Sequence, residues 1–296
     1  MHLCIFNPEH DLCLASGRAL YIPPRSARDF ALRDSHLMQT LYPDALCCSA
    51  YDLPSFKIQN SEFNTITPWG WNPTLKHQLL KAGAPAGLLP SDDRLATLRA
   101  LQHRTTVLPL QPDCRAIYNI VDAEALLREQ PHWVLKAPWS GAGRGLRWLH
   151  GRLSEIDRNW IAKTVSAQRC VIAEPRRDVV ADLALEYNCP FTPSHSPSLP
   201  LTPQFSGYSL FRTGHGVYKE NVMWSDDEIA RHFADTDLQA VRTRVEQWLA
   251  ANILPHYHGP LGVDLMACAD GSIHVAELNL RHTMGMVAHE RLKIKN

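Results

Sequence analysis

Polar and apolar residues alternate near the end of the chain in a pattern that predicts a β-hairpin. Residues 262–266 are apolar around the single acid Asp264, and residues 273–280 form a second alternating run. Between the two runs, residues 269–271 read Ala-Asp-Gly, which is a turn signal. We therefore expect two antiparallel strands joined by a short turn.

The polar residues of this hairpin are the first candidates for chemistry. Side chains two positions apart share a face of a strand, so Glu277, Asn279 and Arg281 lie on one side, and Asp264 can face the same side. Two carboxylates and an amide oxygen suit magnesium, which keeps waters and takes further ligands from nucleotide phosphates. Arg281 could grip an anion through two hydrogen bonds. An ordinary half-solvated strand shows the same alternation, and this alternative stays open.

A lysine and a glycine-rich loop form a second candidate site. Residues 133–136 are a short apolar strand that ends at Lys136. The loop that follows contains Ser140, Gly141, Gly143, Arg144 and Gly145. Glycines let backbone N–H groups approach phosphate oxygens, and the lysine and arginine supply positive charge. The spacing is neither a Walker P-loop nor a dinucleotide fingerprint, and a flexible hairpin turn is the alternative.

Periodicity and capping residues predict the other elements. Strands are expected at 3–6 and 65–68, and helices at 74–81, 91–104 and 238–253, with one more helix capped by Ser225. Five prolines exclude a helix from residues 188–203, which read as an insertion or as a cover over a substrate.

In their order and separation, the lysine strand, the glycine-rich loop and the acidic hairpin resemble the ATP-grasp superfamily. The branch resembled is the carboxylate–amine ligases, of the D-alanine–D-alanine ligase and glutathione synthetase type, over residues 89–289. The resemblance implies a mixed fold (α+β/α/β) in which two α+β subdomains clamp ATP behind a small α/β pre-ATP-grasp domain. The expected boundaries are 1–90 for the small domain, 91–173 for the subdomain with the loop, and 174–296 for the subdomain with the metal site.

The resemblance also implies roles for individual residues. Lys136 and the loop would hold the phosphates, and the hinge strand at 170–175 would contact the adenine, with Glu174 on it. Asp182 would bind the ribose hydroxyls, with Glu186 as runner-up. Magnesium would be bound by Asp264, Glu277 and Asn279.

One departure concerns positive charge. Many of these ligases have an arginine where this chain has Gly262, and its role could pass to Arg212, His215 or Lys219. A further cation is expected before Lys136. Arg104 or Arg115 could reach the phosphates, but a solvated surface position is the favoured reading of both, and neither is assigned.

Polar residues follow the two predicted strands of the first ninety residues. Glu9, His10 and Asp11 come after the first strand, and Trp69, Trp71 and Asn72 come after the strand at 65–68. Open α/β sheets bind ligands at such strand ends, and the resemblance places the acceptor substrate there. Turn and capping chemistry is the competing explanation. The resemblance adds Arg281, Thr283 and Gly285 as contacts to the substrate carboxylate or acyl phosphate.

Composition narrows the class of protein. The 296 residues are 45% hydrophobic and 20% charged, and 30 basic residues balance 30 acidic ones. No basic tract indicates a nucleic-acid or membrane-surface partner, and no apolar run suits a signal peptide or a membrane span. Eight cysteines without a Cys-x-x-Cys pair are expected to be reduced thiols, mostly buried. We expect a cytoplasmic enzyme.

The expected function is an ATP-dependent carboxylate–amine or carboxylate–thiol ligase that forms an acyl phosphate. It would use ATP and Mg²⁺, with Arg281 and Lys136 as catalytic residues, on a small molecule or peptide, and a homodimer is one option for its assembly. Two alternatives stay open: a nucleotide-binding protein without ligase activity, which Gly262 favours, and a small-metabolite kinase on the same fold.

Overall fold

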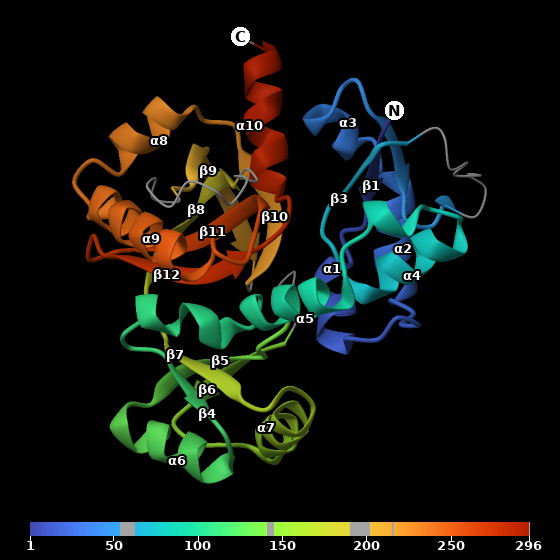
Figure 1. Cartoon of the computed structure of the whole chain (residues 1–296). Helices are drawn as coiled ribbons and strands as arrows, with labels where there is room; N and C mark the ends of the chain where they lie inside the picture. The colour runs from blue at the N-terminus through green and yellow to red at the C-terminus, as the bar shows by residue number, and fades with distance from the viewer. Residues whose placement is uncertain (54–62, 141–144, 190–201, 215, 296) are drawn as a thin grey trace.

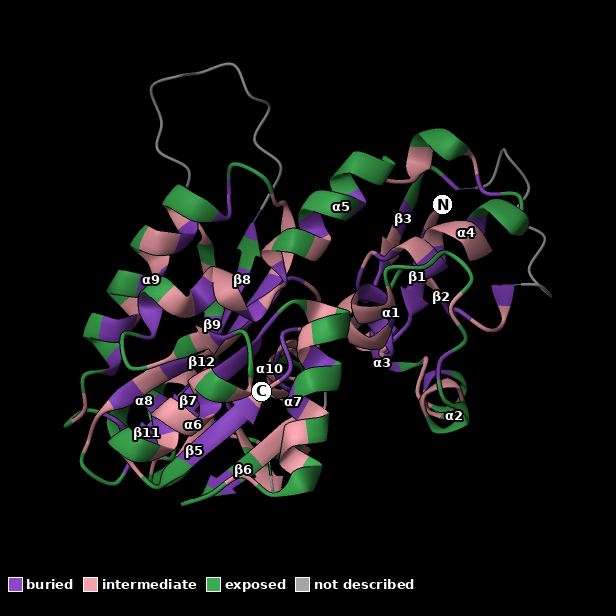
Figure 2. Ribbon diagram, turned by 90° about the horizontal axis from the view of Figure 1, so that it is seen from below, coloured by how far each residue is buried: buried purple, intermediate pink, exposed green. Residues whose placement is uncertain are grey.

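In the described part of the chain, the strands form three sheets that are drawn from successive stretches of the sequence (Figure 1). The computed structural model describes residues 1–53, 63–140, 145–189, 202–214 and 216–295. Buried residues are concentrated on the strands, and the helices carry exposed outer faces (Figure 2). Cys4, Cys170 and Cys268 are buried, as predicted.

The first sheet is parallel, with order β2-β1-β3. Its strands are β1 (His2–Phe6), β2 (Leu46–Ser49) and β3 (Thr65–Pro68). The helices around it are α1 (His10–Ser16), α2 (Arg25–Arg33), α3 (Leu37–Leu41), α4 (Pro73–Lys81) and η2 (Ala86–Leu88). The loops after β1 and β3 meet, because the Asn7 side chain donates to the Gly70 carbonyl at 2.8 Å and accepts from the Gly70 N–H at 3.3 Å.

The second sheet is antiparallel, with order β4-β7-β5-β6. Its strands are β4 (Arg115–Ile117), β5 (His132–Lys136), β6 (Leu146–His150) and β7 (Val171–Pro175). Helices α6 (Ile120–Glu129) and α7 (Glu155–Gln168) both pack on the face that carries Trp133, Leu135 and Ala173. Because side chains alternate along a strand, Lys136 and Glu174 lie on the opposite face, away from these helices.

The third sheet has five strands in the order β10-β9-β8-β11-β12. Its strands are β8 (Val179–Cys189), β9 (Gln204–Gly214), β10 (Val217–Val222), β11 (Gly259–Cys268) and β12 (Ile273–Asn279). Helices α8 (Asp226–His232) and α9 (Leu238–Asn252) pack against Leu185, Val263 and Val275 on one face. Helix α10 (Met284–Lys295) contacts β9 and also α3. Helix α3 belongs to the first lobe, which consists of the first sheet and the helices around it. Asp182, Glu186 and Asp264 alternate with the core residues, so they lie on the face that α8 and α9 leave uncovered.

The segment that begins at the end of α5 (Asp92–Leu101) and continues through η3 (Arg104–Leu110) lies along the edge strand β12. Two glutamine side chains of this segment satisfy the backbone of that edge. The Gln102 amide donates to the Leu278 carbonyl at 3.0 Å and accepts from the Leu280 N–H at 2.9 Å. Gln111 donates to the Val275 carbonyl at 2.8 Å. These bonds replace the ladder bonds of a further strand and fix the residues between the glutamines against β12.

The predicted elements are present. Asp264 lies directly opposite Glu277 in the antiparallel pair β11–β12, as the hairpin prediction requires. Ser91 caps α5, and Asn72 caps α4 through a bond from the Leu75 N–H at 2.9 Å. Most of the proline-rich run, residues 190–201, lies outside the described residues.

The glutamine contacts lead to a stability prediction. Gln102→Leu leaves a buried carbonyl and a buried N–H of the β12 edge without partners, which costs about 1–3 kcal/mol. We expect the midpoint of urea unfolding to fall in this variant and to stay within error in Gln239→Leu, which changes an exposed position of α9. Equal midpoints for the two variants would show that the side chain does not stabilise the edge.

Candidate functional site

Two carboxylates face each other between the second and third sheets. Asp264 and Glu277 are directly paired across β11 and β12, and Asn279 lies two residues further on. Burial first, and then the nearby Glu277 and Glu186 carboxylates, raise the pKa of Asp264 to about 8. Burial and the two neighbouring carboxylates both disfavour the ionised form of Asp264, and a bound cation would favour it.

The donor set suits a cation whose remaining ligands come from elsewhere. Within the residues that the structure describes, no three histidine, cysteine, aspartate or glutamate side chains converge as a metal site. Two carboxylates and one amide oxygen are an incomplete set of hard oxygen ligands, which is what magnesium uses beside phosphates and waters. The assignment of Asp264, Glu277 and Asn279 to a metal stays a prediction.

Arg281 connects this group to the first lobe. Its guanidinium donates to both oxygens of Asp11, at 3.1 and 2.9 Å, and to the Asn279 side-chain oxygen at 2.9 Å. A fourth bond goes to the His282 carbonyl at 3.0 Å. The two-pronged geometry predicted for Arg281 is therefore present, with a carboxylate of this chain as the anion.

The burial of Arg104 is where the structure departs from the sequence pattern. This side chain is buried rather than solvated, and its guanidinium lies 2.7 Å from the Glu277 carboxylate. The same group donates to the Ser140 hydroxyl at 2.6 Å and to the Ser140 carbonyl at 3.1 Å. The helix ends at Leu101, so the face predicted from helical spacing does not extend to Arg104. Arg115 is exposed and paired with Glu129, as expected for a surface position.

The lysine side of the site is built on the second sheet. Lys136 donates to Glu174 at 2.8 Å, and both side chains are largely buried. Asp182 on β8 accepts a bond from the Thr213 hydroxyl at 2.7 Å. Burial raises the pKa of Asp182, while the Thr213 bond and the charge of Lys136 oppose this shift. The charge of Lys136 therefore acts on Glu174 of the second sheet and on Asp182 of the third sheet.

Only part of the glycine-rich loop belongs to the described residues. Ser140 is buried, and Gly145 has φ +75°, a conformation that L side chains rarely adopt. A Cβ atom at Gly145 would lie 2.9 Å from the Ser140 Cβ. Gly141, Gly143 and Arg144 lie outside the described residues, and so does His215. Of the other cations considered for the role of the missing arginine, Arg212 is exposed and pairs with Glu220.

Glu186 contacts the residues at the start of α10. Its buried carboxylate accepts from the Ser209 hydroxyl at 2.9 Å and from the Thr283 hydroxyl at 2.8 Å. Burial raises the pKa of Glu186 to about 7. A Cβ atom at Gly285 would lie 2.0 Å from a Glu186 oxygen, so this close approach requires glycine. Thr283 and Gly285 thus have a packing role that their sequence pattern did not indicate, and their contact with a substrate stays a prediction.

The side chains of Glu9 and His10 are buried in the first lobe. The Tyr51 hydroxyl donates to Glu9 at 2.9 Å, and among the described residues the second Glu9 oxygen has no hydrogen-bond partner. His10 is fully buried, and burial lowers its pKa to about 4. Glu9, His10 and Asp11 were predicted to contact the acceptor substrate. Of these three residues, only Asp11 lines the pocket beside Glu277.

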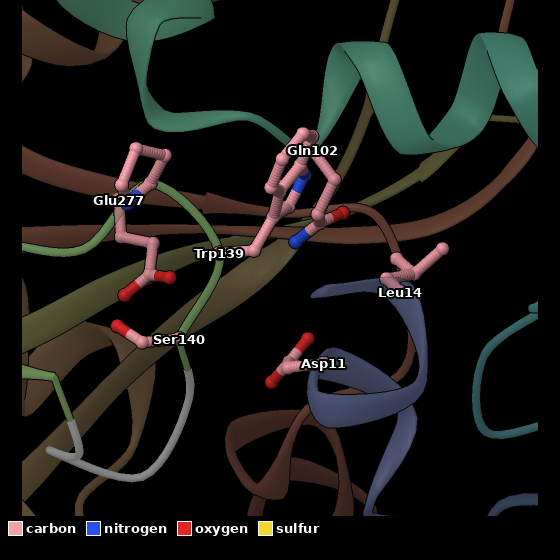
Figure 3. A pocket seen from close by; sticks show the side chains of 7 residues that line it. Asp11, Leu14, Gln102, Trp139, Ser140 and Glu277 are labelled. Atoms are coloured by element: carbon pink, nitrogen blue, oxygen red, sulfur yellow. The ribbon is translucent and has the colours of Figure 1, made fainter. Parts of the chain in front are cut away.

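That pocket is the meeting point of the three parts of the chain (Figure 3). It is lined by Asp11 and Leu14 of α1, by Gln102, by Pro138, Trp139 and Ser140, and by Glu277. Its volume of about 10 Å³ is close to what one water molecule needs. The pocket as it stands therefore has no room for a larger ligand.

Comparison with known proteins identifies the fold. No protein-family model and no curated protein matches the sequence. A solved D-cycloserine synthetase aligns over 100% of this chain and 99% of its own, with a TM-score of 0.56 and 14% identity. N5-carboxyaminoimidazole synthetase from Staphylococcus aureus, solved with ADP, aligns over 95% of this chain and 70% of its own, with a TM-score of 0.51 and 12% identity.

D-alanyl-alanine synthetase A from Vibrio cholerae aligns over 100% of this chain and 93% of its own, with a TM-score of 0.51 and 11% identity. At such identities the likeness establishes the fold and nothing finer. The chain has the ATP-grasp fold, which confirms the fold class predicted from the ordered motifs. Among the described residues, no helix is both long and apolar enough to cross a bilayer.

The buried Glu9 leads to a pH prediction. Its folded-state pKa of about 7 lies above the ordinary value of 4.5, so the folded state binds the proton more tightly. The stability that Glu9 contributes is full below about pH 4.5 and is lost as the pH rises toward 7. Glu9→Gln carries no charge, so its free energy of unfolding relative to the wild type should rise between pH 4 and pH 8, by at most about 3 kcal/mol.

Urea unfolding at the two pH values checks this prediction. Glu155→Gln, at an exposed position of α7, serves as the matched control and should show no such change. A pH-independent difference between Glu9→Gln and the wild type would contradict the burial of a charge at Glu9.

Proposed function

We propose that this ATP-grasp chain is an ATP-dependent ligase that joins a carboxylate to an amine or a thiol through an acyl phosphate. The observation that supports the proposal most is the arrangement of two charged faces. Lys136 and Ser140 come from the second sheet and its loop, Asp264 and Glu277 come from the third sheet, and Arg104 bridges them. A nucleotide triphosphate with a divalent cation is the kind of ligand whose charges match both faces.

The proposed nucleotide contacts follow the elements described above. Glu174 would lie beside the adenine, and Asp182 would accept from the ribose hydroxyls. Lys136, Ser140 and the glycine-rich loop would hold the phosphates. In the structure Lys136 donates one bond to Glu174, and its ammonium has further N–H groups with which to reach a phosphate.

The proposed metal site is the pair of carboxylates with Asn279. Magnesium bound there would supply positive charge that neutralises the phosphates during transfer. Glu277 and Asp264 would hold it, since they are direct cross-strand neighbours, and burial with nearby like charge disfavours the ionised form of Asp264. The Asn279 oxygen already accepts from Arg281 at 2.9 Å, so the same atom can orient the arginine and the metal.

The reaction has two steps. An oxygen of the substrate carboxylate attacks the γ-phosphorus, the bond to the β-phosphate oxygen breaks, and ADP leaves with the electron pair. The amine then attacks the acyl carbon, phosphate leaves, and the amine loses a proton. Arg281 would bind the substrate carboxylate and then the acyl phosphate. This requires its two hydrogen bonds to the Asp11 carboxylate to break first. The protein acts mainly by positioning and by positive charge.

The acceptor would be a small molecule or a peptide, as the names of the similar solved enzymes suggest for those proteins. The three domain boundaries, the cytoplasmic location and a homodimer stay predictions.

One observation favours a second candidate, a nucleotide-binding protein without ligase activity. A Cβ atom at Gly262 would lie 2.7 Å from the Thr283 methyl and 3.0 Å from a Glu186 oxygen, so no cationic side chain can project from this position. The ligase proposal therefore depends on Arg104 and Arg281 for the charge that an arginine there would supply.

Product analysis tests the proposal. The chain is incubated with ATP and magnesium against amino acids and short peptides, and ADP and phosphate are measured. A ligase releases both with an amide or thioester product, a kinase releases ADP with a phosphorylated metabolite, and a binding protein releases neither.

Glu277→Gln should lower the magnesium-dependent turnover at least about 100-fold, because it removes a ligand charge beside the transferred phosphate. Glu129→Gln, whose carboxylate is at the surface, should leave turnover unchanged. Full magnesium-dependent turnover by Glu277→Gln would refute the metal assignment.

A further inference from the structure

Arg99 of α5 supplies hydrogen-bond donors to the end of α1. Its guanidinium donates to the Leu14 carbonyl at 2.6 Å and to the Ala15 carbonyl at 3.1 Å. Carbonyls in the last turn of a helix lack partners within the helix, and a cationic side chain is a favourable donor to them. Helix α1 has no basic residue in its own last turn, so Arg99 provides this charge from another helix.

Gly17 leaves room for this approach. It ends α1 in the left-handed conformation, at φ +64°, and a Cβ atom there would lie 3.0 Å from the Arg99 Nε atom. A larger residue at this position would strain the backbone and crowd the guanidinium. The end of α1 and the side chain of Arg99 therefore fit together closely.

Arg99 also contacts the base of the glycine-rich loop, which is Trp139. The guanidinium carbon lies 3.8 Å from the centre of the Trp139 ring, in a cation–π contact. The indole N–H of Trp139 donates to the Arg99 carbonyl at 3.0 Å. Trp139 directly precedes Ser140, the first residue of the loop. One arginine thus touches both the end of α1 and the start of the loop.

Trp139 is held on its other sides as well. Its main-chain N–H donates to the Gln168 side chain at 2.8 Å. The ring of His103 packs edge-on against the indole, with 4.5 Å between the ring centres. Closely packed side chains pass on a displacement instead of absorbing it. A shift of the loop base is therefore felt at Arg99.

The two ends of this contact line one pocket (Figure 3). Leu14 of α1 and Trp139 both form its wall, together with Asp11 and Ser140. Asp11 lies on α1 and accepts two bonds from Arg281, the residue that the proposed function assigns to the substrate carboxylate. The position of α1 therefore bears on the acceptor side of the site, and Trp139 bears on the phosphate side.

We propose that Arg99 is a positioning residue that couples the glycine-rich loop to α1. The inference rests on the proposed function, in which the loop holds the nucleotide phosphates. Nucleotide bound at the loop fixes Trp139, and through the stacked guanidinium it fixes the last turn of α1. The helix that carries Asp11 is therefore better ordered when nucleotide is present.

The geometry of the contact requires an arginine. A planar guanidinium can donate to two successive carbonyls along its edge while its face stacks on an indole ring. A lysine ammonium is a point charge without a flat face, so it cannot hold the Leu14 and Ala15 carbonyls and stack on Trp139 together.

Hydrogen exchange of α1 tests the coupling without any assumption about the acceptor. Exchange of residues 10–17 is measured by mass spectrometry in the wild type and in Arg99→Met, each alone and saturated with a non-hydrolysable ATP analogue and magnesium. Nucleotide should slow this exchange at least about 5-fold in the wild type and less than about 2-fold in Arg99→Met. Arg94→Met, at an exposed arginine of the same helix, should behave as the wild type.

The ratio of exchange rates without and with nucleotide separates coupling from stability. Loss of a merely structural contact speeds exchange of α1 in both states and leaves the ratio unchanged, whereas loss of coupling lowers the ratio toward one. Calorimetric titration of each variant with the same analogue gives the concentration that saturates its site.

A second pair of variants covers the case in which Arg99→Met does not fold. Trp139→Phe and Trp139→Leu both lose the indole N–H and both keep Arg99 at the end of α1, but only Trp139→Phe keeps an aromatic face for the guanidinium. The ratio should stay above about 3-fold in Trp139→Phe and fall below about 2-fold in Trp139→Leu.

The outcomes distinguish the coupling from the proposed function. If the wild type binds no nucleotide in the calorimeter, the proposed function fails and the coupling fails with it. If the wild type binds nucleotide, but exchange of residues 10–17 is unchanged or slows equally in Arg99→Met, the nucleotide site stands and the coupling is refuted. Equal ratios in Trp139→Phe and Trp139→Leu would refute it as well.

Discussion

The edge of strand β12 is the constraint on which the site depends. Gln102 and Gln111 satisfy the backbone groups of that edge and so hold the segment between them against the third sheet. Arg104 lies in this segment and bonds Ser140 of the second sheet's loop as well as Glu277 of β12. Two sheets that come from different parts of the chain are thereby fixed around one small space. Asp11, bound to Arg281, brings the first lobe to the same place.

Charge is concentrated where these parts meet, and it does little for stability there. Desolvation offsets most of the attraction in a buried ion pair, so Lys136–Glu174 and Arg104–Glu277 are weak evidence for a stable core. The apolar clusters lie behind the sheets, against α6 and α7 on one side and α8 and α9 on the other. The other faces of the second and third sheets carry the polar side chains, and these two faces lie toward each other. Each of these two sheets therefore has one apolar, helix-covered side and one side that carries charged groups.

Local pattern was enough to predict the strand positions of Lys136, Asp264, Glu277 and Asn279, because strand alternation and strand ends determine which face a side chain occupies. The ordered motifs predicted the fold, while the roles of these residues stay predictions. Contacts between distant residues were not accessible. Arg281 and Asp11 pair across 270 positions, and Glu186 meets Thr283 across 97, and no local spacing encodes either. Arg104 was misread because the helix stops three residues before it and a 3₁₀ segment follows. Glu186 stands between Leu185 and Tyr187 in an apolar stretch of its strand, and this pattern is a sequence signal for a buried acid.

The central claim is that nucleotide phosphates and a divalent cation meet between Asp264 and Glu277. The most direct test is a crystal structure of the chain grown with manganese and a non-hydrolysable ATP analogue, with anomalous data collected at the manganese edge. The account predicts an anomalous peak within about 2.0–2.6 Å of an oxygen from each of these carboxylates, with the phosphates beside it. Ordered nucleotide with manganese bound elsewhere, or no ordered nucleotide at saturating concentration, would contradict the account.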